Sequence, residues 1–113
     1  MKIYQLLENL TFHPDNPYAE PLSVDGQGRI LRFSLRPGQS IREHQVPSSP
    51  FIVIVIKGHG IFTGAGGEDQ KVGPDALIEF VPGETHSVRA LDEELIFVGI
   101  LHTVPDKLFG QNS

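Results

Sequence analysis

The chain has 113 residues, a formal net charge of −5 and no cysteine. A chain of this length forms one domain, and the missing thiols exclude disulfides and thiolate metal sites. The acidic balance, with no basic run, argues against nucleic-acid or anionic-membrane partners. The start has no apolar stretch typical of a signal peptide, and the apolar run from Phe51 to Ile56 is too short to cross a bilayer. We therefore expect a single cytoplasmic domain over residues 1–113.

The first 21 residues predict an N-terminal arm outside the main domain. A weak helical spacing places Tyr4, Leu7 and Leu10 on one face, although an extended arm fits equally well. The prolines of 13–21 exclude regular structure there, and 24–28 predicts a turn. The main domain is expected to cover about 29–104.

Short β-strands separated by turns account for the rest of the chain. The segment 51–56 is the strongest of them, because its unbroken β-branched and apolar content predicts burial on both faces. Many short strands with closely spaced turns are typical of an all-β sandwich or barrel. The expected strands are 29–36, 40–46, 51–56, 61–63, 70–72, 76–81, 85–91 and 95–101.

Two histidines stand in separate strand segments, each preceded by a proline–glycine turn. His44 follows Pro37-Gly38, and His86 follows Pro82-Gly83. Because strands alternate their side chains, one residue from each strand can face the same interior point. The sequence therefore predicts a pocket that His44 and His86 share.

The stretch from Gly38 to Ala90 resembles the two motifs of the cupin family. The first motif begins with a glycine, has a histidine after five intervening residues and ends at a second glycine. Gly38, His44 and Gly58 match these positions. The second is similar to Pro82-Gly83-Glu84-Thr85-His86. The resemblance to small RmlC-like cupins implies an all-β, double-stranded β-helix: the cupin jelly-roll barrel.

The chain departs from the family pattern at the positions that hold a metal ion. Metal-dependent cupins resemble one another in three histidines and a glutamate, whereas Val46 and Phe51 stand at two of those four positions here. Two imidazoles alone hold a divalent ion weakly, since protein sites usually supply three or four ligands. Glu84 and His102 are the candidates to complete the set.

The residues expected to line the ligand pocket combine the motif histidines with apolar neighbours. Arg42 joins them because it shares the strand parity of His44, which would place it at the mouth to meet an anionic ligand. The expected pocket consists of His44, His86, Val46, Phe51 and Arg42.

Three functions are compatible with these residues. The first is a small-molecule-binding cupin, and the alternative is a metal-dependent enzyme of dioxygenase or isomerase type that holds Fe, Mn, Ni or Zn on His44 and His86. The third, metal-free acid–base chemistry, is disfavoured because Tyr4 and Tyr18 fall in the arm. We favour the first; the sequence identifies no catalytic residue and leaves enzymatic activity and the ligand open.

A homodimer is the expected assembly. The N-terminal segment supplies apolar side chains at a terminus that would otherwise be loose, so we expect it to pack across a two-fold interface. The resemblance to small cupins, which commonly form dimers, implies the same assembly. These side chains are Ile3, Tyr4, Leu6, Leu7 and Leu10.

Overall fold

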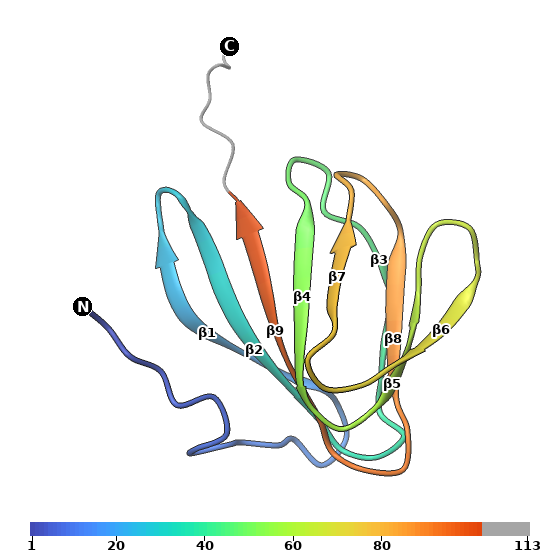
Figure 1. Ribbon diagram of the computed structural model, residues 1–113, viewed down its shortest axis with the longest axis horizontal. Helices are drawn as coiled ribbons and strands as arrows, with labels where there is room; N and C mark the ends of the chain where they lie inside the picture. Colours follow the sequence, from blue (N-terminus) through green and yellow to red (C-terminus); the bar gives the residue numbers. More distant parts are fainter. Residues whose placement is uncertain (103–113) are drawn as a thin grey trace.

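A computed structural model describes residues 1–102, which form nine strands in two antiparallel sheets (Figure 1). The five-stranded sheet has the order β1-β2-β9-β4-β7, and the four-stranded sheet has the order β3-β8-β5-β6. Within the described residues no helix is long and apolar enough to cross a membrane. The strands are β1 (Tyr18–Asp25), β2 (Gly28–Leu35), β3 (Ser40–His44), β4 (Phe51–Lys57), β5 (Gly60–Thr63), β6 (Asp69–Val72), β7 (Leu77–Phe80), β8 (His86–Ala90) and β9 (Leu95–His102).

The all-β fold is confirmed, and every strand expected from residue 29 onward is present. The prediction that 13–21 has no regular structure is wrong from Tyr18 onward, as is the turn at 24–25, because β1 covers both. Pro21 is accommodated because β1 is an edge strand whose register against β2 shifts between Pro21 and Ser23. The segment 4–10 is not helical, and the last two residues of the expected domain, 103–104, lie outside the described part.

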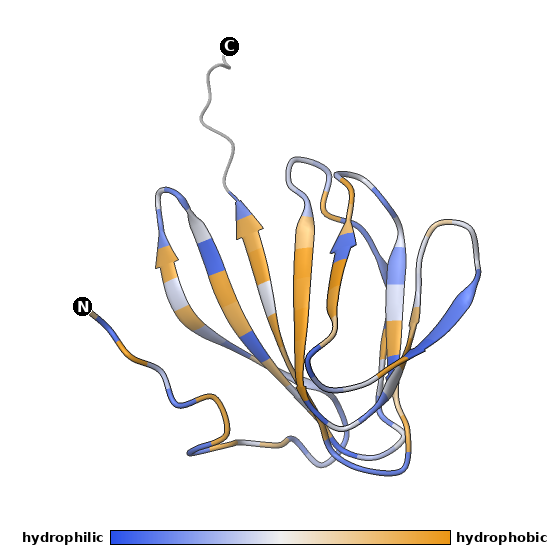
Figure 2. Cartoon of the chain, in the orientation of Figure 1, coloured by the Kyte–Doolittle hydropathy of each residue, from blue (hydrophilic) through white to orange (hydrophobic). Residues whose placement is uncertain are grey.

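The core lies between the inner faces of the two sheets. β4 alternates strictly, so that Phe51, Val53 and Val55 are buried while Ile52, Ile54 and Ile56 are only partly covered. The prediction that β4 is buried on both faces is therefore right for the inner face alone. Figure 2 shows the apolar colour along most of β4, and its partly covered isoleucines present hydrocarbon on the outer face.

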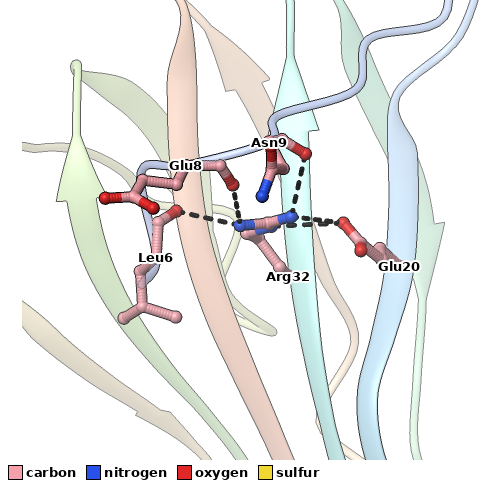
Figure 3. A network of polar contacts seen from close by, with 5 residues as sticks. All are labelled: Leu6, Glu8, Asn9, Glu20 and Arg32. Carbon is pink, nitrogen blue, oxygen red and sulfur yellow. Dashed lines mark hydrogen bonds and ion pairs between the residues drawn. The ribbon is translucent and has the colours of Figure 1, made fainter. Parts of the chain in front are cut away.

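The N-terminal segment crosses the outer face of the five-stranded sheet, held by Arg32 of β2 (Figure 3). The Arg32 side chain is buried, and its guanidinium lies 2.6 Å from the Glu20 carboxylate. It also donates hydrogen bonds of 3.0 to 3.3 Å to the carbonyl oxygens of Leu6, Glu8 and Asn9. A charge-assisted network of this kind explains how a segment without secondary structure has a fixed place on the sheet. We call residues 1–12 the N-terminal strap.

Gly99 of β9 makes room for aromatic rings in the core. A Cβ atom at this position would lie 2.6 Å from the Phe51 ring and 2.9 Å from the Phe33 ring. The Phe33 ring in turn stacks on Phe97, with 4.6 Å between the ring centroids. The absence of a side chain at Gly99 is thus what allows a phenylalanine to occupy position 51.

Substituting alanine for Gly99 should destabilise the protein, because the new methyl group would overlap both rings. We expect Gly99→Ala to lower the free energy of unfolding by about 1–3 kcal/mol. Gly26→Ala is the matched control, since nothing lies within 4 Å of its Cβ position. Urea denaturation of both variants provides the measurement, and equal midpoints would contradict the packing argument.

Candidate functional site

The structure brings the two predicted histidines into direct contact. His44 ends β3 and His86 begins β8, and they face one another in the register of the antiparallel pair. Their Nε2 atoms lie 3.0 Å apart, with 4.2 Å between the ring centroids. Figure 1 shows β4 and β8 starting at the same end of the molecule, and the pair lies at that end because His86 is the first residue of β8.

A β-bulge in β3 sets the position of His44. Ile41 pairs with Val88 and His44 pairs with His86, so three steps along β3 match two along β8. The extra residue interrupts the alternation of side chains. Ile41 and His44 consequently both line the interior, although a regular strand would point them to opposite faces.

Backbone carbonyls fix the orientation of both imidazoles. His86 Nδ1 lies 3.0 Å from the Glu84 carbonyl oxygen, and His44 Nδ1 lies 3.1 Å from the Arg42 carbonyl oxygen. A carbonyl oxygen only accepts hydrogen bonds, so each Nδ1 carries a hydrogen and each neutral ring has a bare Nε2. Two bare lone pairs at 3.0 Å repel one another, and the contact becomes attractive when one proton lies between them. The geometry therefore favours a pair of rings that shares a single proton.

The surroundings of the two rings differ, because His86 is buried and His44 is exposed. His86 is only 4% exposed and lies between the Phe51 and Phe80 rings, at centroid distances of 5.0 and 4.5 Å and interplanar angles of 24° and 20°. Burial, and secondarily the charge of His44, lower the pKa of His86, opposed by its hydrogen bond to the Glu84 carbonyl.

The interior beside the pair is almost completely filled. The remaining space is about 20 Å³, enough for roughly one water molecule. Aromatic rings take up most of the volume, which leaves no room for a ligand unless a side chain moves. The lining residues are His44, His86, Ile41, Val53, Ser87, Val88 and the phenylalanines Phe33, Phe51, Phe62, Phe80 and Phe97.

The other pocket residues expected from the sequence have different positions. Phe51 lines the interior and stacks on His86, whereas Val46 is partly buried against the core. The carbonyl of Val46 accepts a hydrogen bond of 2.8 Å from the Gly83 amide, which ties the two motif segments together. Arg42 does not line the interior: the bulge gives it the opposite facing from His44, and its side chain lies in a groove on the outer face of the sheet. The expectation based on strand parity is wrong for Arg42.

Neither candidate for a third metal ligand joins the histidines. The Glu84 carboxylate accepts hydrogen bonds from the amides of Val81 (3.0 Å) and Ala65 (3.2 Å). His102 is exposed at the end of β9. Over residues 1–102, no three histidine, cysteine, aspartate or glutamate side chains are grouped so that they could hold a metal ion. The Nε2 atoms of His44 and His86 can each coordinate a metal ion, but residues 1–102 place no third histidine or carboxylate ligand beside them.

Sequence reasoning missed Phe80, although it packs on His86 as closely as Phe51 does. Phe80 lies directly opposite Phe51 in the pairing of β4 with β7. The sequence held one signal for this position: Phe80 is two residues after Ile78 in the strand before the Pro82-Gly83 turn, so both side chains face the core.

Comparison with known proteins agrees with this architecture. A family model described as "Cupin domain" matches residues 31–101. A search of the curated proteins finds none that matches. The family model covers the strands that carry both histidines.

Solved structures share the fold at low sequence identity. An RmlC-like cupin protein from Desulfovibrio desulfuricans is 24% identical, with a TM-score of 0.80 over 89% of this chain and 96% of that chain. A conserved protein with a double-stranded β-helix domain from Klebsiella pneumoniae is 19% identical, with a TM-score of 0.84 over 90% of each chain. A protein from Thermus thermophilus is 18% identical, with a TM-score of 0.85 over 93% of this chain and 100% of that chain. At these identities the likeness establishes the fold alone.

The lowered pKa of His86 predicts a loss of stability in mild acid. Because the unfolded chain binds a proton at this position more readily than the folded one, the free energy of unfolding should be highest above pH 6.5 and fall as the pH drops through the folded-state pKa. His86→Gln should flatten this dependence, and His102→Gln, at an exposed position, should leave it in place. Urea titrations between pH 4 and 8 measure the slope; a slope that persists in His86→Gln would contradict the assignment.

Proposed function

This chain belongs to the cupin family, and from that premise we propose that it binds a small molecule that carries one hydrogen-bonding group on an apolar body. The supporting observation is the contact between His44 and His86 at the rim of an interior lined by phenylalanine rings. Small-molecule sites combine an apolar lining with a few polar groups that fix orientation. The histidine pair supplies those polar groups here, and the rings supply the lining.

The two histidines provide complementary chemistry for such a ligand. With each Nδ1 held by a backbone carbonyl, both Nε2 atoms remain for a ligand, and an imidazole Nε2 accepts a hydrogen bond when bare and donates one when protonated. A hydroxyl that inserts between the rings can donate to a bare Nε2, and a carboxylate can accept from an Nε2 that carries a proton. His44 is exposed, so it can swing away and admit that group without crossing the core.

The apolar part of the ligand requires space that the closed structure lacks. The existing 20 Å³ is far below the several hundred Å³ of typical ligand sites. Phe51 and Phe80 stand nearest to the opening beside His86, so we propose that one of these rings moves to admit the ligand. Binding would then convert a minor open conformation into the dominant one.

A metal-dependent enzyme is the alternative that the two bare Nε2 atoms favour. Metal-binding histidines usually donate the other ring nitrogen to a carbonyl or carboxylate, as both rings do here. Val46 and Phe51 weigh against it, because they place hydrocarbon where further ligands would be needed.

We also propose that the protein acts in the cytoplasm, where proteins without cysteine are common.

For the assembly, we propose that a second copy of this chain covers the outer face of the five-stranded sheet. This face carries an apolar groove of about 330 Å³ lined by strap residues Tyr4 and Leu6 and by side chains of β1, β2, β4 and β9. Next to the groove, Ile3 and Leu7 of the strap are exposed. Protruding apolar groups and an apolar groove on one face make it self-complementary, as a two-fold interface requires.

Probe binding separates the ligand-binding function from the metal-dependent alternative. Phenol and benzoate each carry one polar group on an aromatic ring, and toluene has the ring alone. We expect phenol or benzoate to raise the melting temperature saturably, by the equivalent of about 1.4 kcal/mol at ten times its Kd, with toluene weaker. The double variant His44→Ala/His86→Ala should lose the difference between the polar probes and toluene. Equal effects of all three probes on the parent, or none, would contradict the proposal.

Metal content provides the second arm of this test. The protein purified without chelator should hold no stoichiometric metal, and its melting temperature should stay constant on adding Mn, Fe, Ni or Zn salts. Stoichiometric metal in the parent that is absent from His44→Ala/His86→Ala would support the enzyme alternative instead.

The proposed dimer predicts that one charge on the outer face produces monomers. Ile54→Lys places an ammonium in the middle of the apolar face, so light scattering should report the monomer mass, as it should for a chain lacking the strap. Val24→Lys is the control, because Val24 is an exposed apolar side chain that does not line this groove. A persistent Ile54→Lys dimer, or a parent that is monomeric, would contradict the interface.

A further inference from the structure

The outer face of the four-stranded sheet carries a groove that the histidine site does not use. Its volume is about 490 Å³, and its polar lining includes Arg42 of β3, Arg89 of β8 and three hydroxyl side chains, Ser40, Thr63 and Ser87. From this arrangement we propose that the groove binds a small hydroxylated anion through the two guanidinium groups. The proposal is independent of the function assigned to the interior.

The strand register places the two arginines close together. Ser40 is the direct partner of Arg89, and Arg42 is two residues further along β3, on the same face as Ser40. Arg42 is therefore diagonal to Arg89, and diagonal neighbours on paired strands are within reach of long side chains. An anion between the guanidinium groups accepts hydrogen bonds from both.

No carboxylate in the described part of the chain neutralises these two arginines. Neither guanidinium lies within the 4.0 Å ion-pair distance of an aspartate or glutamate there, in contrast to Arg32, which contacts Glu20. Asp69, at the β6 end of the groove, instead accepts a hydrogen bond of 2.6 Å from the Thr63 hydroxyl. Both guanidinium groups thus keep their hydrogen-bond donors for a ligand, while Glu43 and Asp69 supply two negative charges elsewhere in the lining.

The remaining lining indicates what else the ligand carries. Hydroxyls from three strands both donate and accept hydrogen bonds, and the carboxylates of Glu43 and Asp69 accept them at the edges of the groove. These groups suit a ligand with several hydroxyls beside its anionic group. A long polyanion is disfavoured, because the whole chain has a net charge of −5.

Chemical-shift titration with defined anions tests the groove. The probes are inorganic phosphate, glucose 6-phosphate and gluconate, with glucose as the neutral control and sodium chloride holding the ionic strength constant. We expect saturable shifts of backbone amides in 40–42, 61–63 and 87–89 with at least one phosphate or carboxylate probe, and none with glucose. Comparing gluconate with glucose 6-phosphate shows which anionic group the arginines prefer.

Matched variants decide whether the arginines cause the binding. Arg42→Gln and Arg89→Gln should each raise the Kd about tenfold or more, since each removes a charged hydrogen-bonding partner. Arg29→Gln, at an exposed arginine of β2 outside this groove, and His44→Ala/His86→Ala should leave the Kd unchanged. Absence of saturation with every anion, or an equal loss in Arg29→Gln, would overturn the proposal.

Discussion

The contact between His44 Nε2 and His86 Nε2 is the constraint on which the site depends. Both Nδ1 atoms are committed to backbone carbonyls, so neither ring can offer a second hydrogen at Nε2 without taking up charge. The backbone of Arg42 and of Glu84 thus sets the protonation of two side chains. Because the β3 bulge and the turn before β8 fix those carbonyls, the chemistry of the pair follows directly from local backbone structure.

The replacement of ligating groups by hydrocarbon changes what this barrel can hold. Phe51 stacks against the buried imidazole, and Gly99 leaves the space that its ring needs. Burial against these rings lowers the pKa of His86. The result is an interior lined by aromatic rings, with the Nε2 atoms of His44 and His86 at its edge.

Much of the fold could be predicted from sequence, since apolar alternation and proline–glycine turns define the strands from residue 29 onward. The position of the histidines followed from their places in the two motifs. Arg42 could not be placed, because one extra residue in β3 reverses the facing of everything before it and leaves no signal in composition. β1 was hidden by Pro21, which an edge strand accepts and a central strand does not.

The size of the interior space also could not be predicted from sequence. Side-chain identities indicate an aromatic lining, but only their packing shows that five phenylalanines leave about 20 Å³. Nor does strand alternation alone reveal that β4 and β9 present apolar groups outward in a groove that the N-terminal strap helps to line. Both features depend on how distant segments come together in space.

The most direct test of the central claim is a two-dimensional NMR experiment that correlates imidazole nitrogens with ring protons through long-range couplings. We predict that Nδ1 of His44 and Nδ1 of His86 each carry a hydrogen, because each faces a backbone carbonyl oxygen. A neutral ring in either residue with its hydrogen on Nε2 in place of Nδ1 would contradict this prediction.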